Sequence, residues 1–485
     1  MNTAIGQNTA NCDALETGWV IVVDIGKTLS KVTLWSRQGR LLDRQTRPNA
    51  PCIIDGLRRL DLNGIASWLS TALARYRELP IEWIVPVGHG AGVVALGDDG
   101  PLIPPLDYEQ TIPDDVMTAY QHERDTFFQT GSPALPDGLN FGAQLFWLER
   151  LYPETLAKSV LVPWAQYWAW WLTGRAVSEV TSLGCHSDVW SPASASFSPM
   201  AKRLGWANRF APLAKAQDVV GTLRGEVAAK TSLNPAIRVL AGLHDSNAAL
   251  MAARGFLEIG GPKIGEREAT VLSTGTWFIS MRLPASPVSI TDLPEARDCL
   301  VNVDVYGQSV PSARFMGGRE IEALIEIDTR QVDIKPDQPK LLAAVAPVLA
   351  ARAMHFPTLS PGCGPFPASV GGWENAPEDW YERRAAVCLY AALVADQSLN
   401  LIGAGENLLI EGRFAEAEVF VRAIASLRPD TLVFVANAHH DVSFGALRLI
   451  APELMPDGGL RQVEPLDADL ETYRNHWLAT VEQHV

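Results

Sequence analysis

The chain carries a carboxylate, Asp24, at the point where a strand-like apolar run ends. The run is Trp19–Asp24, and the glycine turn Gly26-Lys27-Thr28 follows it almost at once. Backbone amides in such a turn can bind phosphate oxygens, and a neighbouring carboxylate can hold Mg²⁺ through water. The segment therefore indicates a phosphate site, although a plain hairpin with a polar turn would show the same pattern.

This turn does not match a Walker A phosphate loop. That motif requires a glycine five residues before Gly26, where the chain has Ile21, and it requires a helix afterwards, whereas Lys31–Ser36 has the pattern of a strand. A second strand–turn–strand later in the chain has Thr274–Thr276 at its turn. Two glycine hairpins on facing domains could hold a triphosphate between them.

A second carboxylate, Asp245, lies at a predicted strand-to-helix junction. The strand-like segment Val239–Ala241 precedes it, and Asn247–Ala253, which is rich in small helix-forming residues, follows it. Substrates of α/β folds bind at such junctions, so Asp245 could serve as a general base. A helix cap is the structural alternative for this carboxylate.

Histidines occur in two further segments of interest. Gly88–Gly92 contains His89 and follows a predicted strand, but Val93–Leu96 after it is also strand-like, whereas a dinucleotide fingerprint must open a helix. From this loop His89 could reach a small polar substrate, and a tight connection between strands is the alternative. No further ligand lies at zinc spacing from His439-His440-Asp441, so we do not predict zinc there.

Length and composition predict a large globular protein of two or three domains. The chain has 485 residues, of which 47% are hydrophobic and 20% are charged. The formal net charge of −15 argues against nucleic acid and anionic membrane as partners. The six scattered cysteines and the absence of a recognisable signal peptide favour a cytoplasmic protein.

The order of predicted elements indicates an α/β protein made of two duplicated domains, 1–250 and 251–485. An antiparallel β-meander at 19–47 precedes a helix at 60–76 and a strand at 81–87. The hairpin around Gly275 repeats the one around Gly26 in a matching position. Further helices are predicted at 140–152, 163–172, 339–352, 377–402, 415–427, 443–450 and 467–484, with strands at 239–241, 407–411 and 431–436.

In combination, these segments resemble the FGGY family of carbohydrate kinases, which has an actin-like, ribonuclease H-like duplicated fold with a central cleft. The similar segments run from residue 19 to roughly 450 and share the order and spacing of the family. They are VIVVDIGKTLSKVTLW, the middle stretch from TGSPALPDGLNFGAQLFWLERLY to VTSLG, VLAGLHDSNAAL, TVLSTGTWFIS, FMGGREIE and NLLIEGRFAEAEVFVRAIA.

The resemblance implies transfer of the γ-phosphate of ATP to a sugar hydroxyl. Asp24 would lie at the Mg²⁺–phosphate site, and Asp245 would take the proton from the attacking hydroxyl. The first domain would bind the sugar and carry the first phosphate hairpin, and the second domain would carry the other hairpin and bind the nucleotide. Nucleotide contacts would come from Gly26, Lys27, Thr28, Thr274, Gly275, Thr276, Gly412 and Arg413, and sugar contacts from His89, Gly90, Gln144, His244 and Asp245.

Two features look more like the rhamnulose and fuculose kinases than the glycerol or xylulose kinases: the histidine before Asp245 and the GTW of the second hairpin. They favour a ketose, first of all a 6-deoxy-ketohexose such as L-rhamnulose or L-fuculose. The adenosine motif of the family is reduced here to Glu411-Gly412-Arg413, and the His89 loop departs from the rhamnulose kinase pattern. The alternatives are a kinase for another ketose or polyol such as xylulose or ribulose, a non-catalytic sugar sensor, and an actin-fold phosphohydrolase. We expect a small sugar as the partner, with a homodimer as a candidate assembly.

Overall fold

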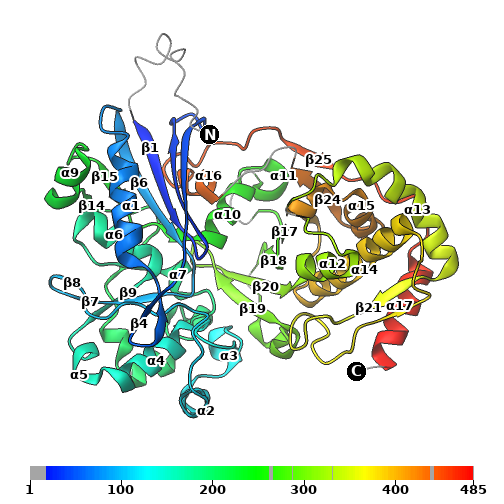
Figure 1. Cartoon of the computed structure of the whole chain (residues 1–485), viewed down its shortest axis with the longest axis horizontal. Helices are drawn as coiled ribbons and strands as arrows, with labels where there is room; N and C mark the ends of the chain where they lie inside the picture. The colour runs from blue at the N-terminus through cyan, green and yellow to red at the C-terminus, as the bar shows by residue number, and fades with distance from the viewer. Residues whose placement is uncertain (1–17, 262–265, 287, 330, 437–441, 484–485) are drawn as a thin grey trace, which may run out of the picture.

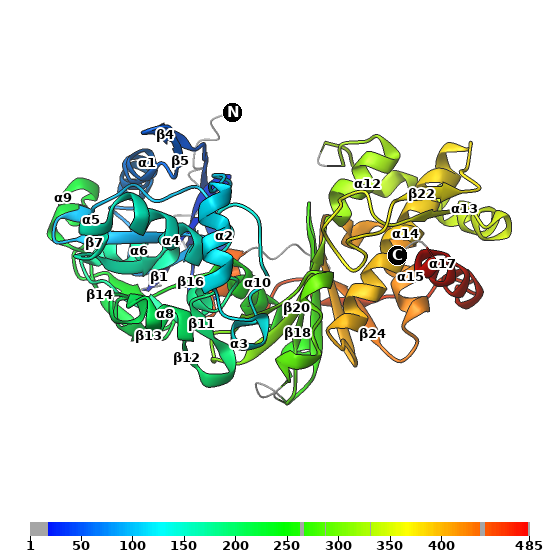
Figure 2. The same ribbon diagram turned by 90° about the horizontal axis from the view of Figure 1, so that it is seen from below.

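The computed structural model describes residues 18–261, 266–286, 288–329, 331–436 and 442–483, and it shows two α/β lobes beside each other (Figure 1). The triplet His439-His440-Asp441 lies outside the described residues. Figure 2 shows helix α10 and strands β18 and β20 in the region where the lobes meet. Among the described helices, none combines the length and apolar character that crossing a membrane requires.

The first lobe is built on a mixed sheet with the strand order β14-β15-β6-β1-β2-β3. Strands β1, β2 and β3 form the predicted antiparallel meander, and β6 and β15 continue the sheet in parallel with β1. Short β16 also pairs with β6. The bounds are β1 Trp19–Ile25, β2 Leu29–Trp35, β3 Leu41–Pro48, β6 Ile81–Gly88, β14 Val219–Thr222, β15 Arg238–Leu240 and β16 Leu243–His244.

The second lobe repeats this arrangement, with the strand order β19-β20-β18-β17-β23-β24-β25. Strands β17, β18 and β20 are antiparallel, and β23 and β24 continue in parallel with β17, as β6 and β15 do with β1. The predicted duplication is therefore present, although β19 enters the chain between β18 and β20. The bounds are β17 Ala269–Thr274, β18 Phe278–Leu283, β19 Cys299–Val303, β20 Ser309–Phe315, β23 Asn407–Gly412, β24 Leu432–Ala436 and β25 Leu460–Gln462.

Helices cover both faces of each sheet and bury the apolar strand residues. In the first lobe, α1 and α6 cover one face of the sheet, while α10 and α16 cover the other. In the second lobe, α12, α13, α14, α15 and α17 share one large core with the sheet. The bounds of these helices are α1 Leu62–Ala74, α6 Trp164–Thr173, α10 Asp245–Ala253, α12 Gly317–Ile325, α13 Gln338–Ala351, α14 Trp380–Leu401, α15 Glu418–Leu427, α16 Val442–Leu447 and α17 Glu471–Gln483.

The predicted helix at 140–152 is α4 (Phe141–Leu151), and the strand after the His89 loop is β7 (Val93–Gly97). Because that loop joins two strands, it cannot be a dinucleotide fingerprint, as expected. Several short elements between residues 153 and 214 were not predicted, among them β9 (Val160–Pro163).

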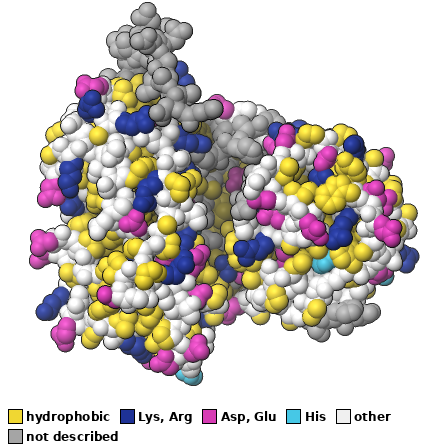
Figure 3. Space-filling model, in the orientation of Figure 1, with side chains coloured by type: hydrophobic (Ala, Val, Ile, Leu, Met, Phe, Trp, Pro, Cys, Tyr) yellow, Lys and Arg dark blue, Asp and Glu magenta, His cyan; other side chains and the backbone are white. Residues whose placement is uncertain are grey.

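Helix α10 lies between the two lobes. Its Ala248 and Met251 are buried in a cluster with the first sheet, whereas Leu250 and Ala253 are buried in a cluster with the second. Helix α16, late in the chain, also packs on the first sheet (Figure 1). The space-filling view shows a hollow between the lobes (Figure 3). The domain boundary at residue 250 falls inside α10 and stays a prediction.

Candidate active site

Strand pairing places Asp24 beside a lysine at the edge of the first sheet. Asp24 lies opposite Lys31 in the β1–β2 ladder, and Lys31 Nζ is 2.8 Å from Asp24 Oδ2. The Asp24 side chain is 6% exposed and the Lys31 side chain 19% exposed, so both charges are largely shielded from bulk water. Because β1 and β6 are parallel and both end here, Asp24 lies at the sheet edge where α/β folds bind ligands.

The first glycine hairpin is held by Asn49. The amide of Gly26 donates to Leu29 O at 3.1 Å, and Asn49 Nδ2 donates to Gly26 O at 2.8 Å. Within the described part of the chain, the amides of Lys27 and Thr28 donate no hydrogen bond. These two amides at the tip therefore remain available for phosphate oxygens.

The ammonium group of Lys27 does not lie at the tip of this hairpin. It forms an ion pair with Asp107, lies 3.4 Å from a carboxylate oxygen of Glu109 and sits 4.5 Å from the centre of the Tyr108 ring. The Lys27 side chain is thus committed to the neighbouring loop. A role for Lys27 at the nucleotide stays a prediction. Its backbone amide alone could fulfil that role.

Asp245 is the first residue of α10, and its surroundings suit a general base. Its Oδ1 accepts hydrogen bonds from the amide of Ser246 at 2.6 Å and from the Ser246 hydroxyl at 3.3 Å. Burial raises the pKa of Asp245 to about 6, against the lowering effects of the Ser246 hydrogen bonds and the charge of Lys31. The carboxylate is therefore mostly ionised at neutral pH, with a pKa close to the pH at which it would accept a proton.

His244 contacts this carboxylate as a neutral ring. Its Nε2 lies 3.2 Å from Asp245 Oδ1, and its side chain is 6% exposed. Burial lowers the pKa of His244 to about 4, so the ring carries no charge at neutral pH. The contact is therefore not an ion pair at neutral pH, and the negative charge on Asp245 is retained.

Lys31 should tune the base electrostatically. Replacing Lys31 with methionine removes a positive charge that favours ionised Asp245, so the pKa of Asp245 should rise further. The acid limb of the kcat–pH profile should then move to higher pH, measured between roughly pH 5 and 8. Lys31→Arg, which keeps the charge, is the control and should leave this limb near its original position. An unmoved limb in Lys31→Met would contradict the assignment.

His89 lies in a buried cluster of aromatic rings near these groups. Its ring stacks on Trp164 at 5.4 Å between centroids and meets the edge of Tyr108 at 5.5 Å. Among the described residues, neither ring nitrogen of His89 has a hydrogen-bond partner. Burial, helped by the charge of Lys27, lowers the pKa of His89 to about 3, so the ring is neutral. Such orphaned polar atoms are expected to bind ligand groups or water.

Gln144 of α4 also has a buried polar atom without a hydrogen-bond partner in the described structure. Its Nε2 donates to Ala91 O at 3.1 Å and to Gly138 O at 2.5 Å, which ties together two loops near His89. Its Oε1 is buried and has no partner in the described structure. Uncharged nitrogen and oxygen atoms of this kind suit the hydroxyl groups of a sugar.

Position 90 requires glycine because two side chains approach its backbone closely. A Cβ at this position would lie 2.6 Å from Cys185 Sγ and 2.8 Å from His244 Nε2. Gly90→Ala should therefore displace His244, lower kcat/KM and reduce the free energy of unfolding by about 1–3 kcal/mol. Urea unfolding and steady-state kinetics would measure both effects. Gly225→Ala is the control, because a Cβ there meets nothing within 4 Å; equal effects in both variants would refute the prediction.

The second hairpin is fixed by the side chain of Thr274. Its hydroxyl donates to Glu411 O at 2.5 Å and accepts from the amide of Phe414 at 3.1 Å. Gly412 has φ +87 and packs against the backbone of Thr274, which leaves no room for a Cβ. The Thr274 hydroxyl is therefore occupied, and a phosphate contact at this hairpin would come from other groups, such as the backbone amide of Thr276.

The predicted adenosine residues lie next to this hairpin. Gly318, near the start of α12, packs against Gly275 O, so α12 and the hairpin touch. The guanidinium of Arg413 lies 3.2 Å from Glu322 of α12 and 5.0 Å from the centre of the Phe414 ring. The structure thus groups Gly275, Gly412 and Arg413, and their contact with a nucleotide stays a prediction.

A bound Mg²⁺ fits the donor set around Asp24. The described residues contain no cluster of three or more side chains with metal-binding potential. Mg²⁺ usually keeps several waters and binds through one or two carboxylates together with substrate phosphates. A single carboxylate beside the first glycine hairpin meets that requirement, and it would not hold a metal ion alone.

Sequence reasoning missed two residues that the tertiary structure brings to this region from different lobes. His186 donates from Nδ1 to Leu139 O at 2.8 Å, and Arg314 lowers the pKa of His186 through its charge, second to burial. Arg314 is held by Asp298 at 2.8 Å and lies 4.9 Å from the centre of the Trp277 ring. No local pattern announces either residue, because their electrostatic interaction joins segments that lie far apart in the chain.

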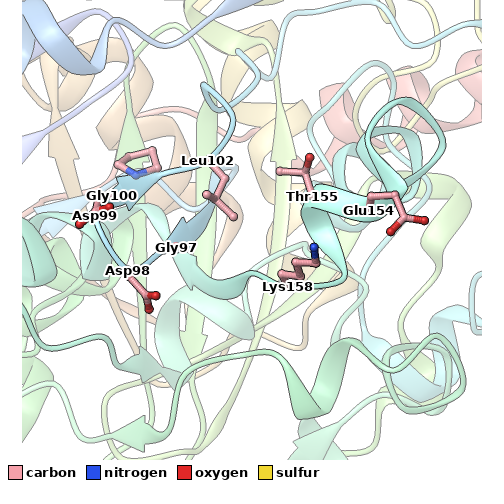
Figure 4. Close-up of a pocket in the computed structure, with 9 residues that line it drawn as sticks. Gly97, Asp98, Asp99, Gly100, Leu102, Glu154, Thr155 and Lys158 are labelled. Carbon is pink, nitrogen blue, oxygen red and sulfur yellow. The ribbon is translucent and has the colours of Figure 1, made fainter.

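A separate surface hollow contains none of these residues. It lies between the turn that joins β7 to β8 (Gly100–Pro101), around Asp98 and Asp99, and the short helix α5 (Pro153–Leu156), near Lys158 (Figure 4). Its acidic side chains point to different sides in the close-up. The hollow therefore lies apart from the candidate site residues.

Comparison with known proteins agrees with this architecture. A model described as the C-terminal domain of FGGY carbohydrate kinases matches residues 266–457. The structure of a carbohydrate kinase from Novosphingobium aromaticivorans is 66% identical, with a TM-score of 0.92 over 95% of this chain and 100% of that one. A xylulose kinase structure from Rhodospirillum rubrum, 19% identical, shares the fold with a TM-score of 0.75 over 96% of this chain and 98% of that one.

A curated relative gives a weaker similarity. L-fuculokinase of Escherichia coli (strain K12) is 26% identical over 288 residues, which is 54% of this chain and 56% of the relative. The match thus spans little more than half the length of that relative. The duplicated actin-like, ribonuclease H-like fold expected from the sequence is confirmed by the structural similarity. The chain belongs to the FGGY family of carbohydrate kinases.

Proposed function

We propose that this protein transfers the γ-phosphate of ATP to a hydroxyl group of a ketose. The observation that carries the proposal is the placement of Asp245. Its pKa is raised to about 6, it lies within the electrostatic reach of Lys31, and Lys31 is 2.8 Å from Asp24. Lys31 thus interacts with both the candidate base and the candidate phosphate-site carboxylate, which supports one shared reaction centre.

In this mechanism the residues mainly position groups and balance charge. Asp245 accepts the proton of the attacking hydroxyl through its carboxylate, while the neutral ring of His244 stays beside it. The tip amides of the two hairpins bind phosphate oxygens. Asp24 would hold Mg²⁺, which neutralises phosphate charge when bound. A sugar seated against His89 and Gln144 would present its hydroxyl to Asp245 in line with the phosphate.

The substrate we favour is a 6-deoxy-ketohexose such as L-fuculose or L-rhamnulose. The His89 ring supports an uncharged, hydroxyl-rich ligand, because it is neutral and its nitrogens have no partner in the described residues. The similarity to L-fuculokinase supports the same substrate class. Cytoplasmic location and a homodimer remain expectations of this proposal.

A coupled assay of ADP release tests the proposal directly. The purified chain with Mg²⁺–ATP would be screened against ketoses, aldoses and polyols, with product phosphorylation verified by mass spectrometry. We expect turnover with a 6-deoxy-ketohexose and little ATP hydrolysis without sugar, because closure of the site should exclude water. Rapid hydrolysis without sugar would favour a phosphohydrolase, and sugar binding without any turnover would favour a sensor.

A further inference from the structure

A buried carboxylate and a buried hydroxyl, those of Glu179 and Thr181, form a small hydrogen-bonded unit near the base. Glu179 ends β10 (Ser178–Glu179) and precedes the short helix α7 (Val180–Leu183). Its Oε2 accepts from the Thr181 amide at 2.9 Å, the Thr181 hydroxyl at 2.5 Å and the Ser182 amide at 3.3 Å. Glu179 and Thr181 are both fully buried.

The Thr181 hydroxyl extends this unit to the base. A hydroxyl has one proton to donate, and Thr181 donates it to Glu179, which directs its lone pairs elsewhere. The oxygen accepts from the backbone amide of His244 at 3.0 Å, across 63 positions of the chain. His244 ends β16 and is the N-cap residue of α10, whose first residue is Asp245.

We propose that Thr181, oriented by Glu179, is a positioning residue for the Asp245 carboxylate. The inference rests on the proposed function, in which Asp245 accepts the proton of the sugar hydroxyl. A fixed His244 amide determines where the backbone turns from β16 into α10, and so where the carboxylate of the next residue lies. Neither Thr181 nor Glu179 needs to touch the substrate.

The chemistry of Glu179 supports a demanding role. A buried carboxylate is costly, and a neutral serine or asparagine would cap a short helix equally well. Its second oxygen, Oε1, has no hydrogen-bond partner among the described residues, and burial raises the pKa of Glu179 to about 7. The three donors on Oε2 instead fix the direction of the Thr181 hydroxyl. A functional need for a fixed direction of the Thr181 hydroxyl would explain why the chain buries the Glu179 carboxylate despite its desolvation cost.

Thr181→Val tests the inference, since valine keeps the shape and removes the hydroxyl. We expect kcat to fall roughly 10- to 100-fold, because small displacements of a catalytic group have large effects. The KM values for sugar and ATP should stay within about twofold, since no binding group is lost. Thr181→Ser restores the hydroxyl and should recover most of kcat.

Thr231→Val is the matched control for loss of a buried hydroxyl. Thr231 is also fully buried, and its hydroxyl donates to Val227 O at 2.7 Å and accepts from the Leu233 amide at 3.3 Å. Both valine variants should lose similar stability, but only Thr181→Val should lose kcat. Equal kcat in the two variants, or a fall in kcat that Thr181→Ser does not reverse, would overturn the inference.

Two further measurements separate the steps of the argument. Glu179→Met, which removes the acceptor oxygen of the Thr181 hydroxyl, should lower kcat in the wild-type background and have little further effect in Thr181→Val; additive effects, or no effect at all, would show that Glu179 does not act through Thr181. Hydrogen exchange at the His244 amide requires no substrate. It should be faster in Thr181→Val than in wild type, and unchanged exchange would refute the contact.

If the wild type phosphorylates no sugar, the proposed function fails by itself, and the exchange data still decide whether Thr181 holds this backbone.

Discussion

Asp245→Asn is expected to lower kcat by roughly 10²–10⁴ while the protein stays folded, because asparagine cannot accept the proton of the sugar hydroxyl. In wild type, kcat should fall as the pH drops below about 6, where Asp245 becomes protonated. This acid limb should be absent from the residual activity of the variant. Coupled kinetics across this pH range would measure both effects.

The stability of Asp245→Asn should move in the opposite direction to its activity. Because the pKa of Asp245 is raised on folding, the folded state binds this proton more tightly than the unfolded state. Stability from this group therefore falls as the pH rises to about 6 and stays low above it. Asparagine carries no charge to bury, so at pH 7 the variant should be at least as stable as wild type in thermal unfolding.

Asp379→Asn is the control for a purely structural role at the start of a helix. Asp379 caps α14 and accepts from the amides of Tyr381 at 2.8 Å and Glu382 at 3.0 Å, much as Asp245 accepts from the amide of Ser246. Asp379 is exposed to solvent, so its replacement should leave kcat unchanged. If Asp245→Asn changed kcat as little as Asp379→Asn, Asp245 would only stabilise the start of α10.

Asp24→Ala is expected to lower kcat with Mg²⁺–ATP by roughly 10²–10³, a magnitude typical of losing one group that stabilises charge at the reaction centre. Binding of the sugar substrate should change little, because the proposed sugar contacts at His89 and Gln144 remain intact. A Mg²⁺ titration of activity together with calorimetry of sugar binding would separate the two effects.

Asp43→Ala is the matched control for Asp24→Ala. Asp43 lies on β3 of the same sheet and accepts a hydrogen bond from the Tyr76 hydroxyl at 2.9 Å, away from the hairpins. This variant should retain normal Mg²⁺ dependence. If Asp24→Ala also retained it, Asp24 would have no role in holding the metal.

Local patterns were sufficient to predict most of the framework. The apolar runs around Asp24 and Ser273 are strands, and the glycine turns between strands are hairpins, because strand alternation and turn chemistry act over a few residues. The register of the first hairpin, which places Lys31 opposite Asp24, also follows from its short turn. Lys31 is therefore recognisable from the sequence as the residue opposite Asp24.

The added strand β19 and helix α16 could not be predicted in the same way. Strand β19 lies at the edge of the second sheet, next to β20. In the chain, however, it comes between β18 and β20, two strands of the meander. Helix α16 was expected as a helix, but its burial against the first sheet joins Phe444 and Leu447 to residues of β1 and β6. Such placements depend on which apolar faces meet, and a helix of this length fits many faces equally well.

The sequence by itself determined the family resemblance, the two hairpins and the candidate base, since each rests on a short motif with local physical causes. Only the tertiary structure decided how these parts act together. It directs the Lys27 side chain to Asp107, occupies the Thr274 hydroxyl, and ties the His244 amide to Thr181 across 63 positions. Burial then sets the pKa of Asp245, because desolvation depends on all neighbours of the carboxylate and on no single motif.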